Sequence, residues 1–264
     1  MKQFVIVAIV VCLFAIQAQA AERILALSPA ACEMLFAIGA GSEVIGASDY
    51  CDFPEPAKHL PHVANARQIF VEPTLRLKPT LIVASNTHLK GIKSLQDDGI
   101  RILFTHPRHI SDVFSDMRRL GVATGHKRKA ENLTQTLECE LHTMTSHQGR
   151  RIPVFFEVWS DPLMSQGGKS FVTEVIEAAG GRNVFGGVEL ESMRINVEAV
   201  LRAKPEVIVI PSKSGDIHSR RTFWHTWLKG VRVISINPDL ISRPGPRLVH
   251  GVKELQRKLL AVPR

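Results

Sequence analysis

Three loop segments of this chain carry aromatic and charged side chains suited to binding a flat, polar ligand. Tyr50 and Asp52 follow a predicted strand in the first half, and Trp159 follows one in the second half. Arg243 and Arg247 follow the last predicted strand. Because the chain contains only one tyrosine and three tryptophans, aromatic side chains on such loops are unusual choices. They are candidate ligand contacts, although each aromatic could instead pack on its own lobe and Arg243 could be a solvated turn residue.

The residue spacings that support catalysis are absent from the sequence. SQGGKS (165–170) imitates the end of a phosphate-binding loop, but Leu163 stands where that motif requires glycine. There is no G-x-S-x-G motif, and the eleven histidines include no H-E-x-x-H or H-x-H grouping. We therefore predict no catalytic residue, no cofactor and no metal site. An exported hydrolase or metalloenzyme is the less favoured alternative class.

A repeated phrase indicates which elements position these loops. VEPTLRLKPTLIVAS (71–85) returns as VEAVLRAKPEVIVIP (197–211), with 8 identical residues in 15 at an offset of 126. Each copy predicts a short helix that ends before proline, followed by a buried strand of the parallel type. The offset is far longer than the period of a solenoid repeat. The chain is therefore predicted to be an α/β protein of two similar lobes with a ligand cleft between them.

The two lobes are predicted at residues 21–110 and 151–264, each with a central parallel sheet. Residues 127–148 contain no glycine or proline. Apolar side chains recur there at spacings of three to four: Leu133, Leu137, Leu141 and Met144. This pattern predicts an amphipathic helix with earlier turns before it. The range 111–150 is thus expected to form one long helix that joins the lobes and limits hinge closure.

The first twenty residues predict export. Lys2 precedes an apolar run of 13 residues (4–16), and AQA (18–20) supplies the small residues of a signal peptidase site. The run is too short for a transmembrane helix, which needs about 20 apolar residues. Residues 1–20 are therefore predicted to be a cleavable signal peptide. Ala21 rather than cysteine follows the cut, so we expect a soluble exported protein without a lipid anchor.

Charge and cysteine content narrow the set of partners. Without Lys2, 32 basic and 25 acidic side chains give a net charge of +7, which favours weak contact with anionic surfaces. The basic residues are scattered and no nucleic-acid motif occurs, so nucleic acid is not an expected partner.

Three cysteines follow the signal peptide, namely Cys32, Cys51 and Cys139. An odd number permits at most one internal disulfide, and Cys32 and Cys51 are candidates near the first-lobe cleft.

Four segments together resemble a known family. These are LSPAACEMLFAIGAGSEVIGASDYCDFP (27–54), VEPTLRLKPTLIVAS (71–85), EAAGGRNVF (177–185) and SRPGPRLVHGVKEL (242–255). They are similar to the cobalamin-type members of the class III periplasmic binding proteins that serve ABC importers, a class that also takes ferric siderophores and haem. The similarity extends from about residue 22 to the C-terminus. It implies two lobes around a shallow cleft, joined by one long helix, in a monomeric, non-enzymatic periplasmic receptor.

The resemblance also implies a ligand site. Tyr50 falls on the family's cleft tyrosine, and Trp159 falls on a common aromatic position. The second-lobe loop that touches the ligand corresponds to Leu240, Ile241, Ser242, Arg243 and Pro244. Ala66 and Leu240 stand where the best-known cobalamin binders place tryptophans. The expected ligand is a corrinoid such as cobalamin. A ferric siderophore or haem is the alternative, since the two arginines near the C-terminus could meet an anionic chelate.

The resemblance further implies that one acidic residue on each lobe pairs with arginines of the two subunits of an ABC permease. Glu72 and Glu198 occupy those positions, one in each copy of the repeated phrase. A carboxylate in the first turn of a helix is also favoured by the helix dipole, by about 0.3–1 kcal/mol. The dipole alone would explain both glutamates without a partner. The matched pair favours docking onto a permease dimer.

Overall fold

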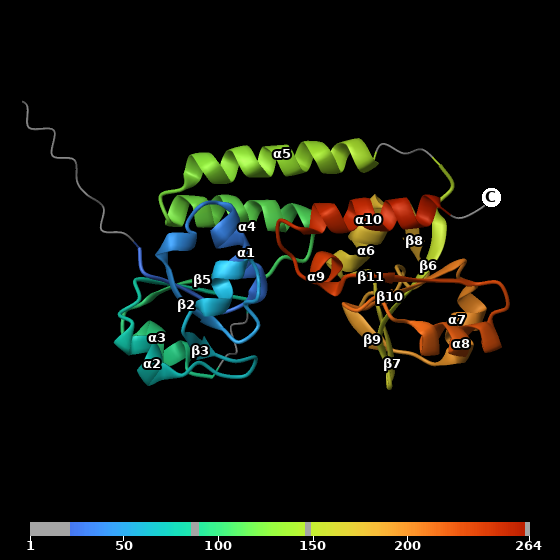
Figure 1. Cartoon of the computed structure of the whole chain (residues 1–264), viewed down its shortest axis with the longest axis horizontal. Helices are drawn as coiled ribbons and strands as arrows, with labels where there is room; N and C mark the ends of the chain where they lie inside the picture. Colours follow the sequence, from blue (N-terminus) through green and yellow to red (C-terminus); the bar gives the residue numbers. More distant parts are fainter. Residues whose placement is uncertain (1–21, 86–89, 146–148, 262–264) are drawn as a thin grey trace, which may run out of the picture.

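Two α/β lobes lie side by side beneath a layer of helices in the computed structural model, which describes residues 22–85, 90–145 and 149–261 (Figure 1). The predicted signal peptide lies outside these residues. Within the described ranges, no helix is long and apolar enough to cross a membrane. The predicted fold class, two lobes with central parallel sheets, is confirmed.

The N-terminal lobe is built on a parallel sheet in the order β3-β2-β1-β4-β5. Its strands are β1 (Ile24–Ala26), β2 (Val44–Ser48), β3 (His62–Ala64), β4 (Leu81–Ala84) and β5 (Arg101–Phe104). Every residue of β1 and β4 is buried, as expected for strands that are covered on both faces. Alternate residues belong to different cores: Ile24 packs into one cluster, and Leu25 and Ile82 into the other.

Helices cover both faces of this sheet. They are α1 (Pro29–Ala37), α2 (Val71–Arg76) and α3 (Ile92–Asp97), with 3-10 turns at Gly41–Glu43 and Glu55–His59. Ser28 begins α1, because its hydroxyl accepts a hydrogen bond from Ala31 N at 3.2 Å and Pro29 suits the first helical position. Residues of α1 share a core with Ile24, whereas Leu95 of α3 packs with Leu25 on the other face.

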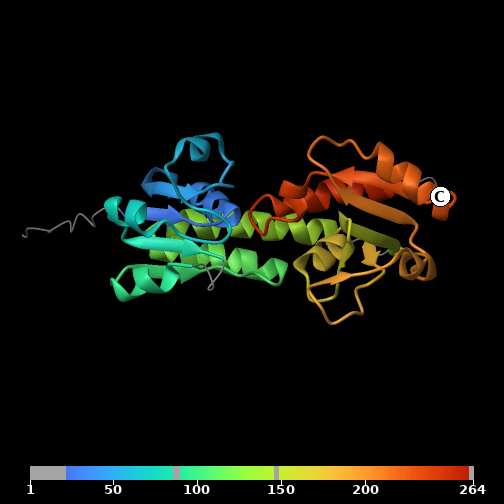
Figure 2. The same ribbon diagram turned by 90° about the horizontal axis from the view of Figure 1, so that it is seen from below.

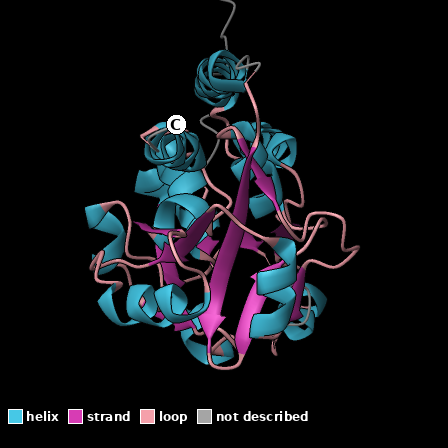
Figure 3. Ribbon diagram, turned by 90° about the vertical axis from the view of Figure 1, so that its right-hand side faces the viewer, coloured by secondary structure: helices cyan, strands magenta, loops and turns pink. Residues whose placement is uncertain are grey.

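The C-terminal lobe has a mixed sheet in the order β11-β10-β6-β7-β9, with β8 also paired to β6. Its elements are β6 (Ile152–Ser160), β7 (Leu163–Gln166), α6 (Phe171–Ala178), β8 (Gly181–Asn183), β9 (Ser192–Arg194), α7 (Val197–Ala203), β10 (Val207–Pro211), α8 (His218–Trp227) and β11 (Arg232–Ile236). Strands β7 and β9 are antiparallel to their neighbours. Seen from the C-lobe end, helices flank the strands (Figure 3).

The two copies of the repeated phrase adopt the same local structure. In each, a short helix leads into a parallel strand that lies next to an edge strand of its sheet: α2 into β4, and α7 into β10. The residue before each proline, Lys78 or Lys204, has a positive φ of 47° or 49°. Such a left-handed conformation is uncommon outside glycine, so its occurrence at both sites marks the lobes as structurally equivalent.

The helical layer consists of α4 (Ile110–Ala123), α5 (Lys127–Thr145) and α10 (Leu248–Leu260), with the short α9 (Pro238–Ile241) before α10. Residues 111–150 therefore hold two helices where one was expected. Gly125, with φ +75°, follows the end of α4 and allows the chain to reverse. Helix α5 then runs back across both α4 and α10 (Figure 1). Gln256 of α10 donates to Met144 O of α5 at 3.0 Å, which fastens this helix to the second lobe.

Candidate functional site

The carboxyl ends of β2, β10 and β11 lead into residues that meet between the lobes, and the two lobes lie side by side in the view from below (Figure 2). Asp52 follows β2, Lys213 follows β10 and Asp239 follows β11. Lys213 Nζ lies 3.2 Å from Asp52 and 3.0 Å from Asp239. In open α/β sheets, ligands bind at this carboxyl edge. The facing edges therefore form the candidate ligand cleft.

The N-lobe half of the cleft is hollowed. A cavity of about 230 Å³ is lined by residues that follow β1, β2, β3 and β4, among them Ser28, Tyr50, Asn65, Ala66 and Ser85. Tyr50 is 61% exposed, so its ring is available to a ligand. Small side chains such as Ala66 leave this hollow open.

The C-lobe half presents Trp159 near the end of β6. Its side chain is 62% exposed, and its indole Nε1 donates to Asp161 O at 2.7 Å, which fixes the ring. The lining described for the N-lobe hollow contains no C-lobe residue. The structure thus leaves Tyr50 and Trp159 as two separate exposed aromatics rather than the walls of one pocket.

The second-lobe segment expected to touch a ligand includes the end of α9. Ile241 is fully buried in the hydrophobic core, so its side chain offers no surface to a ligand, contrary to the expectation. Ser242 is exposed, whereas Leu240 and Pro244 are half-buried. Only part of the predicted segment is available for contact.

Arg243 and Asp52, both predicted ligand contacts, bind each other. Arg243 Nη1 lies 2.6 Å from Asp52 Oδ1 and 3.3 Å from Glu33 Oε1, and Nη2 lies 3.0 Å from Asp239. Arg247 donates to both oxygens of Glu33, at 2.8 and 2.5 Å. We call Glu33, Asp52, Lys213, Asp239, Arg243 and Arg247 the cross-lobe network. It joins two N-lobe carboxylates to the C-lobe and contains equal numbers of acidic and basic groups.

Two members of the cross-lobe network, Asp52 and Lys213, have pKa values shifted in favour of their charged forms. The hydrogen bond from Arg243 lowers the pKa of Asp52 to about 2, and the hydrogen bond to Asp239 raises the pKa of Lys213. A depressed carboxyl pKa stabilises the folded state above the ordinary Asp pKa of about 3.9. That contribution is lost only as the pH falls through about 2. Asp52 and Lys213 therefore stay ionised at neutral and mildly acidic pH.

Glu33, Lys213 and Asp239 were missed as functional residues in the sequence. Glu33 is 2% exposed on a helix whose neighbouring residues are apolar. A glutamate within such an apolar run is a signal, because glutamate is seldom fully buried unless it is paired. Lys213 and Asp239 carry no comparable local signal.

A second link between the lobes lies at the start of α4. Glu174 of α6 binds the His109 ring through one oxygen, and its other oxygen accepts from Ile110 N at 2.8 Å. The hydrogen bond with Glu174 raises the pKa of His109. A carboxylate of one lobe therefore caps the first helix that leaves the other.

Glu72 and Glu198, the predicted docking residues, lie at equivalent positions in the first turns of α2 and α7. Both are exposed. Arg76 Nη2 lies 3.8 Å from Glu72, but both side chains are more than three-quarters exposed, at 79% and 87%, so this pair is weak. The side chain of Asn196 caps α7 by accepting a hydrogen bond from Ala199 N, so Glu198 is not needed to cap this helix.

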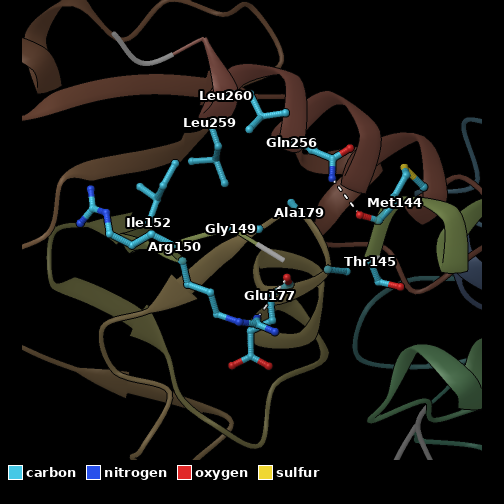
Figure 4. Close-up of a pocket in the computed structure, with 13 residues that line it drawn as sticks. Met144, Thr145, Gly149, Arg150, Ile152, Glu177, Ala179, Gln256, Leu259 and Leu260 are labelled. Atoms are coloured by element: carbon cyan, nitrogen blue, oxygen red, sulfur yellow. Dashed lines mark hydrogen bonds between the residues drawn. The ribbon is translucent and has the colours of Figure 1, made fainter. Parts of the chain in front are cut away.

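The segment SQGGKS is hydrogen-bonded within its own lobe. The backbone N–H groups of Gly167, Gly168 and Lys169 donate to carbonyls of residues 188–191, so SQGGKS does not cradle a phosphate. In the ranges that the structure describes, no group of three His, Cys, Asp or Glu side chains could hold a metal ion. A separate pocket beside α5, α6 and α10 measures about 60 Å³ (Figure 4), which is room for a few waters.

Comparison with known proteins identifies relatives over nearly the whole chain. The periplasmic binding protein family matches residues 24–222. The vitamin B12-binding protein of Yersinia pseudotuberculosis is 31% identical over 261 residues, covering 97% of this chain and 93% of that one. The periplasmic vitamin B12 binding protein BtuF of Vibrio cholerae has a TM-score of 0.78 at 26% identity, over 90% of this chain and 96% of that one.

A haem-binding protein is similar in fold. The periplasmic heme-binding protein RhuT from Roseiflexus sp. RS-1 also has a TM-score of 0.78, at 23% identity, over 90% of this chain and 97% of that one. The same two-lobed architecture therefore occurs in proteins named for different ligands. Given the family match over most of its length and this shared architecture, the chain belongs to the periplasmic binding protein family.

Proposed function

We propose that this chain captures a corrinoid such as cobalamin in the periplasm and delivers it, as a monomer, to an ABC import permease. The names of the relatives that match the full chain support a corrinoid. The observation that carries the choice of ligand is the balance of charge in the cross-lobe network. Its three cations are each bound to a carboxylate.

A balanced network favours a ligand without net charge. Cyanocobalamin is neutral overall and carries amide groups around its ring. An anionic chelate such as haem, with its propionates, would have to draw Arg243 away from Asp52 and Glu33. Breaking a partly buried ion pair leaves a carboxylate with unmet charge, at a cost of a few kcal/mol. Arg243 and Arg247, which the sequence made candidates for contact with an anionic chelate, are therefore already bound to carboxylates.

Contact with the ligand would come from flat side chains and loop backbone. Tyr50 and Trp159 are both more than half exposed, at 61% and 62%, and large exposed aromatics mark binding surfaces. Ser242, Leu240 and Pro244 would add contacts from the second lobe. The family to which the chain belongs consists of binding proteins, and we infer capture without catalysis.

Calorimetry with cyanocobalamin, haem and a ferric hydroxamate siderophore tests the proposal. We expect a one-to-one heat with cyanocobalamin and weaker heats with the two iron chelates. Absence of binding to any corrinoid, together with tight binding of haem, would replace the proposal by its iron-chelate alternative. Asp52→Asn frees part of the Arg243 charge and should raise affinity for haem relative to cyanocobalamin. Asp98→Asn, at an exposed site on the same lobe, is the matched control and should change neither.

Delivery would use the two equivalent glutamates. We infer that Glu72 and Glu198 pair with basic residues on the two subunits of the permease. Support comes from their equal charge, their exposure and their matched positions on the two lobes. A partner with two-fold symmetry requires such matched contacts.

A further inference from the structure

Two buried thiols lie together where α1 begins. Cys32 is 0% exposed and Cys51 is 2% exposed, and both belong to the same core cluster. Cys51 Sγ contacts Ala26 O, at the end of β1, at 3.5 Å and the Ser48 hydroxyl at 3.4 Å. Helix α1 starts just after β1, so the loop that carries Cys51 lies beside the start of the helix that carries Cys32. The two thiols are close enough to shift each other's pKa.

Each of these cysteines precedes a carboxylate of the cross-lobe network. Cys32 precedes Glu33, and Cys51 precedes Asp52. Arg243 Nη1 reaches both acids, at 3.3 and 2.6 Å. One guanidinium can do this only while α1 and the loop keep their spacing. The contact between the two sulfurs lies beside both acids and is placed to set that spacing.

We propose that Cys32 and Cys51 form a disulfide in the exported protein, and that this bridge holds Glu33 and Asp52 in position for the second-lobe arginines. The structure holds the pair as free thiols. Disulfides form and persist in exported proteins. The inference does not depend on which ligand the protein binds.

The oxidant is a disulfide of an exported thiol oxidoreductase. Exchange begins at one of the two thiols, for example Cys51. Its thiolate attacks the oxidoreductase disulfide, forms a mixed disulfide and releases one thiolate. Cys32 then loses its proton and attacks Cys51 Sγ, which forms the Cys32–Cys51 bond and releases the second thiolate. The oxidoreductase gains two electrons and both protons. Because both sulfurs are buried once folded, the exchange takes place during folding.

Alkylation followed by peptide mapping tests the bridge directly. Full-length protein exported to the periplasm is denatured without reductant, treated with iodoacetamide and digested. We expect alkylated Cys139, which is exposed, and a linked pair of peptides that contain Cys32 and Cys51. Alkylation of both Cys32 and Cys51 in this sample, and again after incubation with oxidised glutathione, would overturn the proposal. A Cys139→Ser variant removes bridges between copies and must give the same linked pair.

Two further measurements separate the bridge from its effect on the network. Reduction should lower the melting temperature of the wild-type protein by roughly 5–10 °C, and it should leave that of Cys51→Ser unchanged. The effects of Asp52→Asn and Arg243→Gln on melting temperature should be less additive in oxidised than in reduced protein. Equal non-additivity in the two states would overturn the positioning role, even where peptide mapping finds the bridge.

Discussion

The two lobes carry the same charge on their outer helices, α2 and α7, and opposite charges where they face each other. Helices α2 and α7 each carry a glutamate in the first turn and end in a left-handed lysine before proline. Across the cleft, the N-lobe offers Glu33 and Asp52, whereas the C-lobe supplies the cations that bind them. Equal charges suit two equivalent contacts with one partner, and opposite charges hold two halves together.

Reversing the charge of the equivalent glutamates should have the largest effect on function. In Glu72→Lys with Glu198→Lys, we expect cellular uptake of cyanocobalamin to fall at least about a hundredfold, because like charges would face each other at the permease. Stability should change by only about 0.5 kcal/mol, as is usual for surface sites. Uptake assays and calorimetry on the same variants measure the two properties.

The control for this variant is Glu140→Lys, an exposed site on α5, which should transport normally. The single alanine variants should show partial loss of uptake with unchanged ligand affinity. Normal uptake by the double lysine variant would mean that the glutamates serve only their helix starts.

Breaking the opposite charges should cost stability instead. Arg247→Met leaves Glu33, whose side chain is 1% exposed, with only the 3.3 Å contact to Arg243. We expect a loss of about 3 kcal/mol in the free energy of unfolding, since an uncompensated buried charge is costly. Chemical denaturation of both proteins gives the difference.

A matched control is Arg150→Met. Arg150 also binds a carboxylate with two hydrogen bonds, to Glu206 at 2.6 and 2.7 Å, but the pair is 72% and 40% exposed. Its loss should cost much less, because ion pairs between exposed side chains contribute little to stability. Similar losses for both variants would contradict a special role for burial in the cross-lobe network.

The sequence predicted that the two lobes have equivalent structures, but it predicted only some of the oppositely charged residues that join them. The repeated phrase predicted both helix–strand units because the pattern is local: a helix stopped by proline and a continuous apolar strand. The hairpin of β6 and β7 has no such local signal, since DPLMSQ (161–166) lacks the alternation of a strand. The single helix expected over 111–150 divides at Gly125.

Pairings between distant residues explain the remaining misses. Arg243 and Asp52 are 191 positions apart, and Arg247 and Glu33 are 214 apart. No local pattern reports which distant charge will neutralise another. Loop position made Arg243 and Asp52 candidate ligand contacts, and in the structure each is bound to the other.

The exposed aromatics offer a smaller test of the cleft. On the corrinoid proposal, Tyr50→Ala and Trp159→Ala should each weaken cyanocobalamin binding roughly tenfold, because each removes one flat contact. Trp227→Ala, at a tryptophan that is 50% exposed on α8, is the control and should bind normally. A loss confined to one of the two cleft variants would mean that only that lobe contacts the ring of the ligand.

The smallest expected effect concerns the link between His109 and Glu174, in which the two lobes exchange the signs of their charges. Here the N-lobe side supplies the cation, His109, and the C-lobe supplies the carboxylate, Glu174. The hydrogen bond with Glu174 raises the pKa of His109, so its contribution is complete below the ordinary His pKa of about 6.5 and is lost as the pH rises through the raised value. Neighbouring Asp112, whose pKa is lowered by hydrogen bonds from the backbone N–H groups of His109 and Arg108, stays ionised throughout.

His109→Gln should therefore reduce the melting temperature more at mildly acidic than at alkaline pH, by a difference on the order of 1 °C. Asp52→Asn provides the comparison, since the pKa of Asp52 is about 2 and the effect of that variant should be constant over the same range. The hydrogen bond from Ile110 N to Glu174 does not titrate and should persist in both proteins. A pH-independent effect of His109→Gln would show that Glu174 joins the lobes through the end of α4 alone, without help from the imidazolium charge.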